Sequence, residues 1–139
     1  MAVAALLPLS PAHAAYGPPQ PISMGTSGGG QILALADGTL QFDDGNTKFL
    51  YYIELCRVSS FSAPYIKVYV NGVYQYSLYW EGNTTTSRCP AGYRSTIHSA
   101  ESSHGGTVAN VTFTLVSSDF INNVYRERTR TVTYDNPYN

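Results

Sequence analysis

The pattern that most constrains the fold of this chain is YIKVYVNGVYQYSLYW, which spans residues 65–80. β-Branched and aromatic residues dominate on both sides of Asn71-Gly72, and Asn-Gly between two such runs is typical of a two-residue hairpin turn. The pattern therefore predicts two antiparallel strands. Which face of this hairpin is buried is the question that bears most directly on function.

The rest of the chain also predicts strands, with no segment of helical periodicity and no internal repeat. The expected strands cover residues 31–36, 39–42, 48–58, 65–70, 73–80, 93–98, 108–116 and 124–134. About seven or eight short strands separated by turns are typical of a single antiparallel β-sandwich. The fold class is therefore expected to be all-β.

Several connections and faces follow from the same patterns. Asp37-Gly38 predicts a hairpin turn, residues 43–46 predict a plain turn, and residues 99–106 predict a polar turn. The run 48–58 is nearly continuous in apolar and aromatic residues, which predicts a central strand covered on both faces. In residues 108–116 the alternation predicts two faces, with Ala109, Val111, Phe113 and Leu115 inward and Val108, Asn110, Thr112 and Thr114 outward.

Two cysteines, Cys56 and Cys89, are expected to form a disulfide that ties the polar loop 81–92 to the central strand. Trp80 lies between them in the sequence. In general architecture this arrangement resembles an immunoglobulin-like domain, although in that family the tryptophan lies on an early strand, far from the second cysteine. No family is assigned.

The first residues indicate export. Residues 1–14 contain a short apolar run followed by Ala-His-Ala, which is typical of a signal peptide cleavage site, although no Lys or Arg precedes the run. Residues 15–30 are rich in Pro, Gly and Ser and predict a leader without regular structure. The β-sandwich is expected to span residues 31–139, in a secreted, extracellular or periplasmic protein without a membrane span.

The composition excludes some functions. A net charge of −1 argues against nucleic-acid binding, which normally requires a basic excess. No catalytic signature, cofactor motif or metal motif is present, so we expect a protein that is not an enzyme and needs no cofactor. His98, Glu101 and His104 are close in sequence, but a strand turns Glu101 away from both histidines, so no metal site is expected.

The hairpin carries the main candidate site. With a regular two-residue loop, Ile66, Val68, Val70 and Val73 share one face. The opposite face then presents an aromatic platform of Tyr65, Tyr69, Tyr74 and Tyr76, with Trp80 beyond it. If that platform is exposed, it suits a sugar ring or a protein partner. If it is core, the aromatic pairs only stabilise the sheet.

The last expected strand carries a second candidate site. Arg126, Arg128 and Arg130 are two residues apart and therefore lie on one face of a strand. Three guanidinium groups in a row could bind an acidic glycan or an acidic partner. The alternative is an edge strand that its charges protect from pairing with other chains.

We therefore expect a secreted or periplasmic non-catalytic binding module whose ligand is a carbohydrate or a protein. Two alternatives stay open. One is a structural subunit of a surface or envelope assembly, which would self-associate through an edge strand or through the leader. The other is a secreted inhibitor or immunity protein that acts through the loop 81–92.

Overall fold

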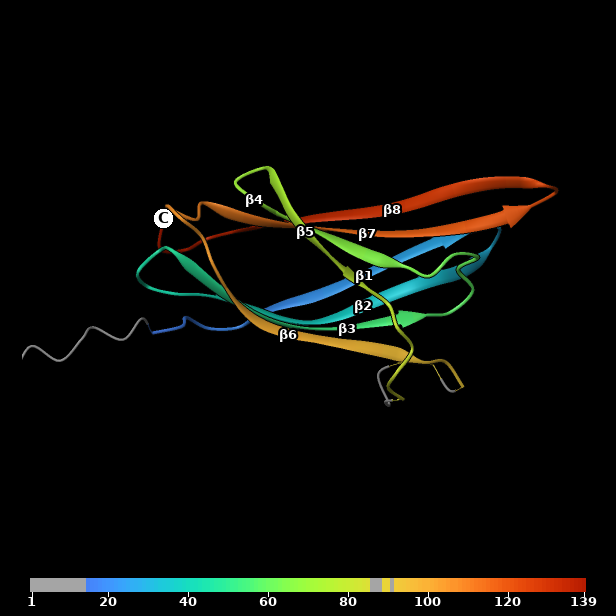
Figure 1. Ribbon diagram of the computed structural model, residues 1–139, viewed down its shortest axis with the longest axis horizontal. Helices are drawn as coiled ribbons and strands as arrows, with labels where there is room; N and C mark the ends of the chain where they lie inside the picture. Colours follow the sequence, from blue (N-terminus) through green and yellow to red (C-terminus); the bar gives the residue numbers. More distant parts are fainter. Residues whose placement is uncertain (1–14, 86–88, 91) are drawn as a thin grey trace, which may run out of the picture.

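Residues 15–85, 89–90 and 92–139 are described by the computed structural model, which folds them into two packed antiparallel sheets (Figure 1). Each sheet has four strands, in the order β1-β2-β3-β6 in one and β5-β4-β7-β8 in the other. The strands are β1 Gln20–Gly28, β2 Gln31–Phe42, β3 Lys48–Arg57, β4 Tyr65–Val70, β5 Val73–Tyr79, β6 Ser95–Ser103, β7 Asn110–Ile121 and β8 Val124–Asp135. Across this part of the chain there is no helix, and so none that could cross a membrane.

The core lies between the two sheets and is built from alternate residues of each strand. Phe49 and Ile53 of β3 face Val68 of β4 and Phe113 of β7, and all four are fully buried. The predicted all-β sandwich is confirmed, as is the Cys56–Cys89 disulfide. The arrangement is consistent with an immunoglobulin-like architecture.

The prediction that residues 15–30 form an unstructured leader is wrong. Residues 20–28 form β1, the edge strand of the first sheet, which pairs with β2 along its whole length. Ile22, Met24 and Thr26 alternate inward into the sandwich. The Pro and Gly content hides this alternation, because Pro21 is tolerated only where an edge strand needs no amide hydrogen at that position.

The predicted turn at Asp37-Gly38 is also wrong, since both residues lie inside the continuous strand β2. Gly38 pairs with Ile53 of β3, and a Cβ atom at this position would collide with the carbonyl group of Tyr52. The glycine therefore permits close approach of two backbones rather than a turn. The actual turn follows Phe42, where the Asp43 carboxylate accepts hydrogen bonds from the amides of Thr47 and Lys48.

Two expectations in the second half of the chain need correction. Residues 99–103 continue strand β6 instead of forming a turn, because their backbone pairs with β3 although their side chains are polar and largely exposed. Val108, predicted to point outward, is fully buried just before β7 begins. The inward positions of Val111, Phe113 and Leu115 are confirmed.

Candidate binding surface

The hairpin of β4 and β5 has the predicted turn but not the predicted register. Asn71 and Gly72 form the two-residue loop with positive φ angles of 52° and 80°, as a type I′ turn requires. Tyr69 pairs with Tyr74, but the next pair joins Val68 to Tyr76. Gln75 is the extra residue of a β-bulge, which shifts every later residue of β5 by one position relative to β4.

The bulge exchanges two tyrosines between the faces of the hairpin. Tyr76, predicted on the aromatic platform, is half-buried and packs against the core beside Tyr51. Burial, followed by the neighbouring Tyr76 hydroxyl, raises the pKa of Tyr51 above the ordinary tyrosine value. Tyr79, predicted on the opposite face, takes the place of Tyr76 on the platform and is 58% exposed. The exchange could not be predicted from the sequence, because a regular hairpin register keeps Tyr76 on the platform and Tyr79 on the opposite face.

Trp80 does not belong to the platform either. Its ring is half-buried and packs against the core. The indole nitrogen donates a hydrogen bond to the carbonyl oxygen of Arg94 at 3.0 Å, and the Arg57 guanidinium lies 5.2 Å from the ring centre. Both contacts hold the tryptophan in the fold, so we assign it a structural role.

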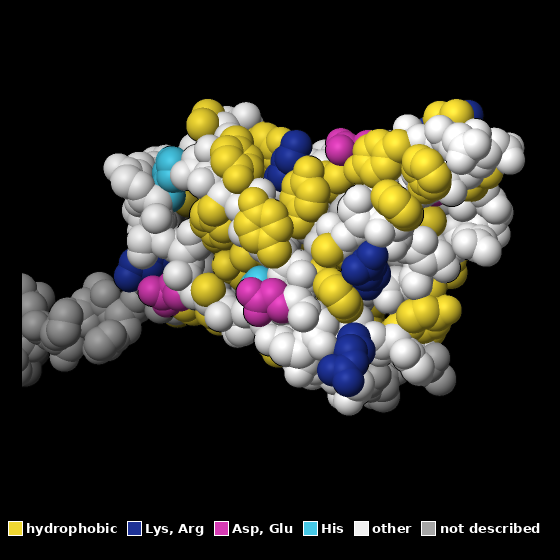
Figure 2. All heavy atoms as spheres, turned by 45° about the vertical axis from the view of Figure 1, so that its right-hand side comes forward, with side chains coloured by type: hydrophobic (Ala, Val, Ile, Leu, Met, Phe, Trp, Pro, Cys, Tyr) yellow, Lys and Arg dark blue, Asp and Glu magenta, His cyan; other side chains and the backbone are white. Residues whose placement is uncertain are grey.

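The aromatic face that remains is exposed. Ile66, Val68 and Val70 point into the core, and the odd-numbered residues of β4 therefore face outward. They form an open hollow of about 530 Å³ together with residues of β5. Its lining, which we call the tyrosine cradle, consists of Tyr65, Lys67, Tyr69, Tyr74, Ser77 and Tyr79. Figure 2 shows hydrophobic side chains gathered on this face over β4 and β5, with a basic side chain among them.

The tyrosine cradle consists of three cross-strand pairs. At one end the rings of Tyr65 and Tyr79 lie 5.7 Å apart, and at the other end those of Tyr69 and Tyr74 lie 5.8 Å apart, edge to face. The third pair, Lys67 and Ser77, lies between them. At about 3.3 Å per residue, the two aromatic pairs are separated by about 13 Å along β4.

Hydrogen-bonding groups line the centre of the cradle. The Tyr74 hydroxyl and the Ser77 hydroxyl lie 2.9 Å apart and share a hydrogen bond. Partial burial, then the charge of Glu127, raises the pKa of Tyr65, while the nearby charge of Lys67 opposes this shift. The lining contains no carboxylate, histidine or cysteine. It therefore offers aromatic stacking, hydrogen bonding and one positive charge.

A second exposed aromatic group lies on the same side of the sheet, near the tip of the β7–β8 hairpin. The rings of Phe61 and Phe120 stack at 5.0 Å, and Tyr125 packs edge-on against Phe61 at 6.3 Å. Figure 2 shows hydrophobic side chains toward this end of the molecule as well. This group could not be predicted from the sequence, because Phe61 lies in the connection between β3 and β4, far in sequence from the other two rings.

The arginine stripe lies on the opposite face of the same sheet. Arg126, Arg128 and Arg130 alternate with outward-facing residues of β8 and share the inner face with Val132, which packs against the core. Arg128 forms an ion pair with Asp119, which is 4% exposed, at an Nε–Oδ2 distance of 3.0 Å. The two candidate surfaces therefore do not join, and at least Arg128 is a structural residue.

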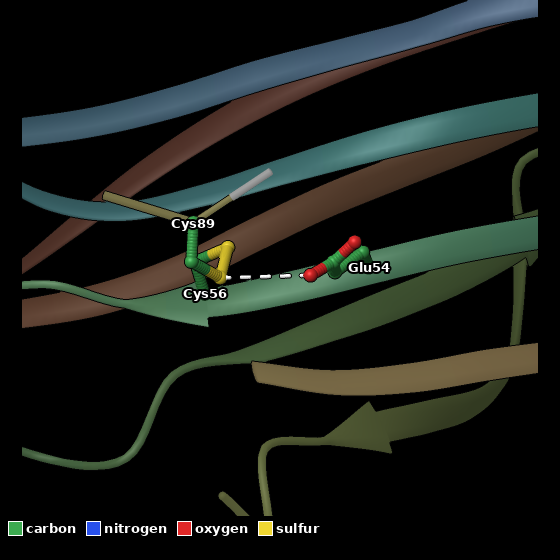
Figure 3. Close-up of side chains that lie close together, drawn as sticks. All are labelled: Glu54, Cys56 and Cys89. Atoms are coloured by element: carbon green, nitrogen blue, oxygen red, sulfur yellow. Dashed lines mark hydrogen bonds between the residues drawn. A yellow bond between two sulfur atoms is a disulfide. The ribbon is translucent and has the colours of Figure 1, made fainter. Parts of the chain in front are cut away.

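The disulfide covers the outer face of β3. Cys56 and Cys89 are joined with a Cα–Cα distance of 5.7 Å, and beside them Glu54 is 1% exposed. Figure 3 shows the three side chains, with Cys89 Sγ 3.7 Å from Glu54 Oε1. Because a disulfide sulfur carries no hydrogen, this approach is a van der Waals contact. The cluster offers three ligand-type atoms within 4.8 Å, but no thiolate is free to bind a metal.

The histidines near β6 are engaged separately. His98 Nε2 lies 2.8 Å from the carbonyl oxygen of Tyr79, across the edge of the sandwich. Glu101 accepts a hydrogen bond from the Tyr16 hydroxyl and lies 3.8 Å from the Lys48 ammonium group. The amide of His104 donates to the carbonyl oxygen of Thr47. The structure does not bring these three side chains together.

Comparison of the chain with protein-family models, with curated protein sequences and with solved structures finds no match.

Proposed function

We propose that this protein is a non-catalytic binding module that recognises a glycan through the tyrosine cradle. The observation that carries the proposal is the presence of two tyrosine pairs on either side of a polar centre, each pair with one exposed and one half-buried ring. An exposed aromatic patch of this kind usually marks a binding surface in a soluble domain.

Several features of the cradle support a sugar ligand. A tyrosine ring offers an apolar face for stacking against the C–H groups of a sugar and a hydroxyl that can hydrogen bond with its edge. The hydroxyls of Tyr74 and Ser77 and the Lys67 ammonium group lie between the rings and supply polar contacts. The separation of about 13 Å between the aromatic pairs leaves room for more than one sugar ring.

The test is removal of one aromatic pair. A double variant with Tyr69→Ala and Tyr74→Ala should abolish binding to a panel of immobilised neutral and acidic polysaccharides. Its melting temperature should change little, because Tyr74 is 51% exposed and the core residues behind the pair are untouched. Tyr93→Ala removes a tyrosine that is 39% exposed and lies outside the cradle, and it serves as the matched control.

Two results would contradict the proposal. One is a double variant that still binds with unchanged affinity. The other is binding by the wild type to a protein partner alone, with no affinity for any polysaccharide of the panel.

We further propose that the protein is exported. The Cys56–Cys89 disulfide fits an extracellular protein, because disulfides persist in oxidising compartments. Residues 1–14 lie outside the described residues and remain a predicted signal peptide. Expression of residues 1–139 in a bacterial host, followed by mass spectrometry of the exported protein, should find the amino terminus near Ala15. Retention of the uncleaved chain in the cytoplasm would contradict export.

The alternative functions have less support. In the alternative of a self-assembling subunit, the leader would pair with a neighbouring chain. Residues 20–28 already pair with β2 of their own chain, so this segment is not free to do so. The 12-residue edge strand β8 remains available for such pairing, and concentration-dependent sedimentation would reveal it. An inhibitor that acts through the loop 81–92 remains a prediction from the sequence.

A further inference from the structure

We propose that the tyrosine cradle selects sugars that carry a negative group, a carboxylate or a sulfate, and that Lys67 binds this group. The inference rests on the proposed function and specifies the class of ligand.

Lys67 occupies the middle of the cradle. It pairs with Ser77 across the hairpin, and one aromatic pair stands on each side of it along the strands. The side chain is partly covered by these neighbours. A ligand that stacks on both aromatic pairs must therefore lie over the ammonium group.

Among the described residues, the Lys67 ammonium group has no counter-ion. Within residues 15–85, 89–90 and 92–139 the side-chain ion pairs are Lys48 with Glu101 and Arg128 with Asp119, and neither involves Lys67. The acid on this face that influences the cradle is Glu127, which acts on Tyr65. Glu127 is two strands away from Lys67 and lies four residues, about 13 Å, along β8 from the position level with it.

Covering an unpaired charge has a cost that depends on the ligand. A neutral sugar that displaces water from the Lys67 ammonium group replaces strong hydration with weaker hydrogen bonds. A carboxylate or sulfate forms a charge-assisted hydrogen bond with the same group, in a site that the aromatic rings shield partly from water. The cradle therefore favours an acidic ligand over a neutral ligand of the same shape.

The experiment compares an acidic ligand with its uncharged methyl ester. Oligomers of polygalacturonate and their methyl esters share one sugar backbone, and calorimetric titration gives both dissociation constants. We expect the acidic oligomer to bind about tenfold more tightly or better, with an advantage that shrinks as salt is added. Lys67→Gln should remove the advantage, and Lys67→Arg should retain most of it.

A matched control separates the cradle from the arginine stripe. Arg126→Gln removes the same charge from an exposed residue on the opposite face, and it should leave the preference intact. The proposal is overturned if Arg126→Gln removes the preference while Lys67→Gln does not.

The remaining outcomes distinguish this inference from the proposed function. Equal affinity of the wild type for the acidic and the neutral oligomer overturns the charge selection and leaves glycan binding standing. If neither oligomer binds, dextran sulfate and dextran form a second matched pair of different backbone. Absence of binding to all four probes overturns both proposals.

Discussion

Val68 of β4 pairs with Tyr76 of β5, so that a valine and a tyrosine on the core side of the hairpin lie opposite each other. Gln75, the residue that a regular hairpin would place opposite Val68, is the extra residue of the bulge. This single insertion decides which tyrosines are exposed. It places Tyr79 in the cradle and Tyr76 against the core.

Deletion of Gln75 should therefore be tolerated. Without it, Tyr69 still pairs with Tyr74 and Val68 still pairs with Tyr76, now in a regular ladder. We expect a change in the free energy of unfolding of about 1 kcal/mol or less, measured by urea denaturation. Deletion of Lys67 is the control, because β4 pairs with β7 in a regular register, so the deletion would turn the buried Ile66 outward and should prevent folding. If the Gln75 deletion variant failed to fold, this result would contradict the assignment of Gln75 as the extra residue of the bulge.

Substitution of Tyr76 and of Tyr79 should have opposite effects. Tyr76→Ala removes a ring that packs against the core and should lower the free energy of unfolding by about 2 kcal/mol. Tyr79→Ala removes an exposed ring of the cradle and should weaken glycan binding with little loss of stability. Denaturation curves and binding titrations of both variants provide the comparison. A destabilised Tyr79→Ala beside a stable Tyr76→Ala would favour the regular register.

The stability of the protein should fall at alkaline pH. Burial raises the pKa of Tyr51 and Tyr134 above the ordinary tyrosine value of about 10, so above that pH the unfolded chain releases protons that the folded protein retains. Stability is therefore full below about pH 10 and decreases above it. Thermal unfolding across this range should show a shallower decrease for Tyr51→Phe than for the wild type.

The control for this measurement is Tyr138→Phe, which removes a phenol from a side chain that is 41% exposed. An identical decrease in the wild type and in Tyr51→Phe would show that Tyr51 titrates alike in the folded and the unfolded chain.

Arg128 should matter for stability more than its two neighbours in the stripe. Arg128→Met leaves the Asp119 carboxylate buried without its ion pair, and one oxygen of this carboxylate already has no hydrogen-bond partner among the described residues. We expect a loss of about 3 kcal/mol in the free energy of unfolding. Arg126→Met and Arg130→Met serve as controls and should change it by about 0.5 kcal/mol or less, because both side chains are exposed. Equal effects of the three substitutions would contradict a structural role for Arg128.

The sequence by itself determined the fold class, the hairpin turn and most strands. The Asn71-Gly72 turn was predictable because two adjacent residues with positive φ need those residue types. The alternation of Val111, Phe113 and Leu115 was predictable because a strand between a core and solvent repeats every two residues. These signals are local, so they can be read without knowing what packs against them.

Tertiary structure alone decided the rest. Strand β1 and the interior position of Gly38 follow from backbone pairing with a neighbouring strand, which leaves no trace in the composition of the segment itself. The bulge at Gln75 likewise appears only when β5 is aligned with β4. A one-residue shift exchanges the two faces of a strand, because side chains alternate with a period of two residues. The sequence pattern therefore placed Tyr65, Tyr69 and Tyr74 on one face, whereas the register alone decided that Tyr79 rather than Tyr76 completes the cradle.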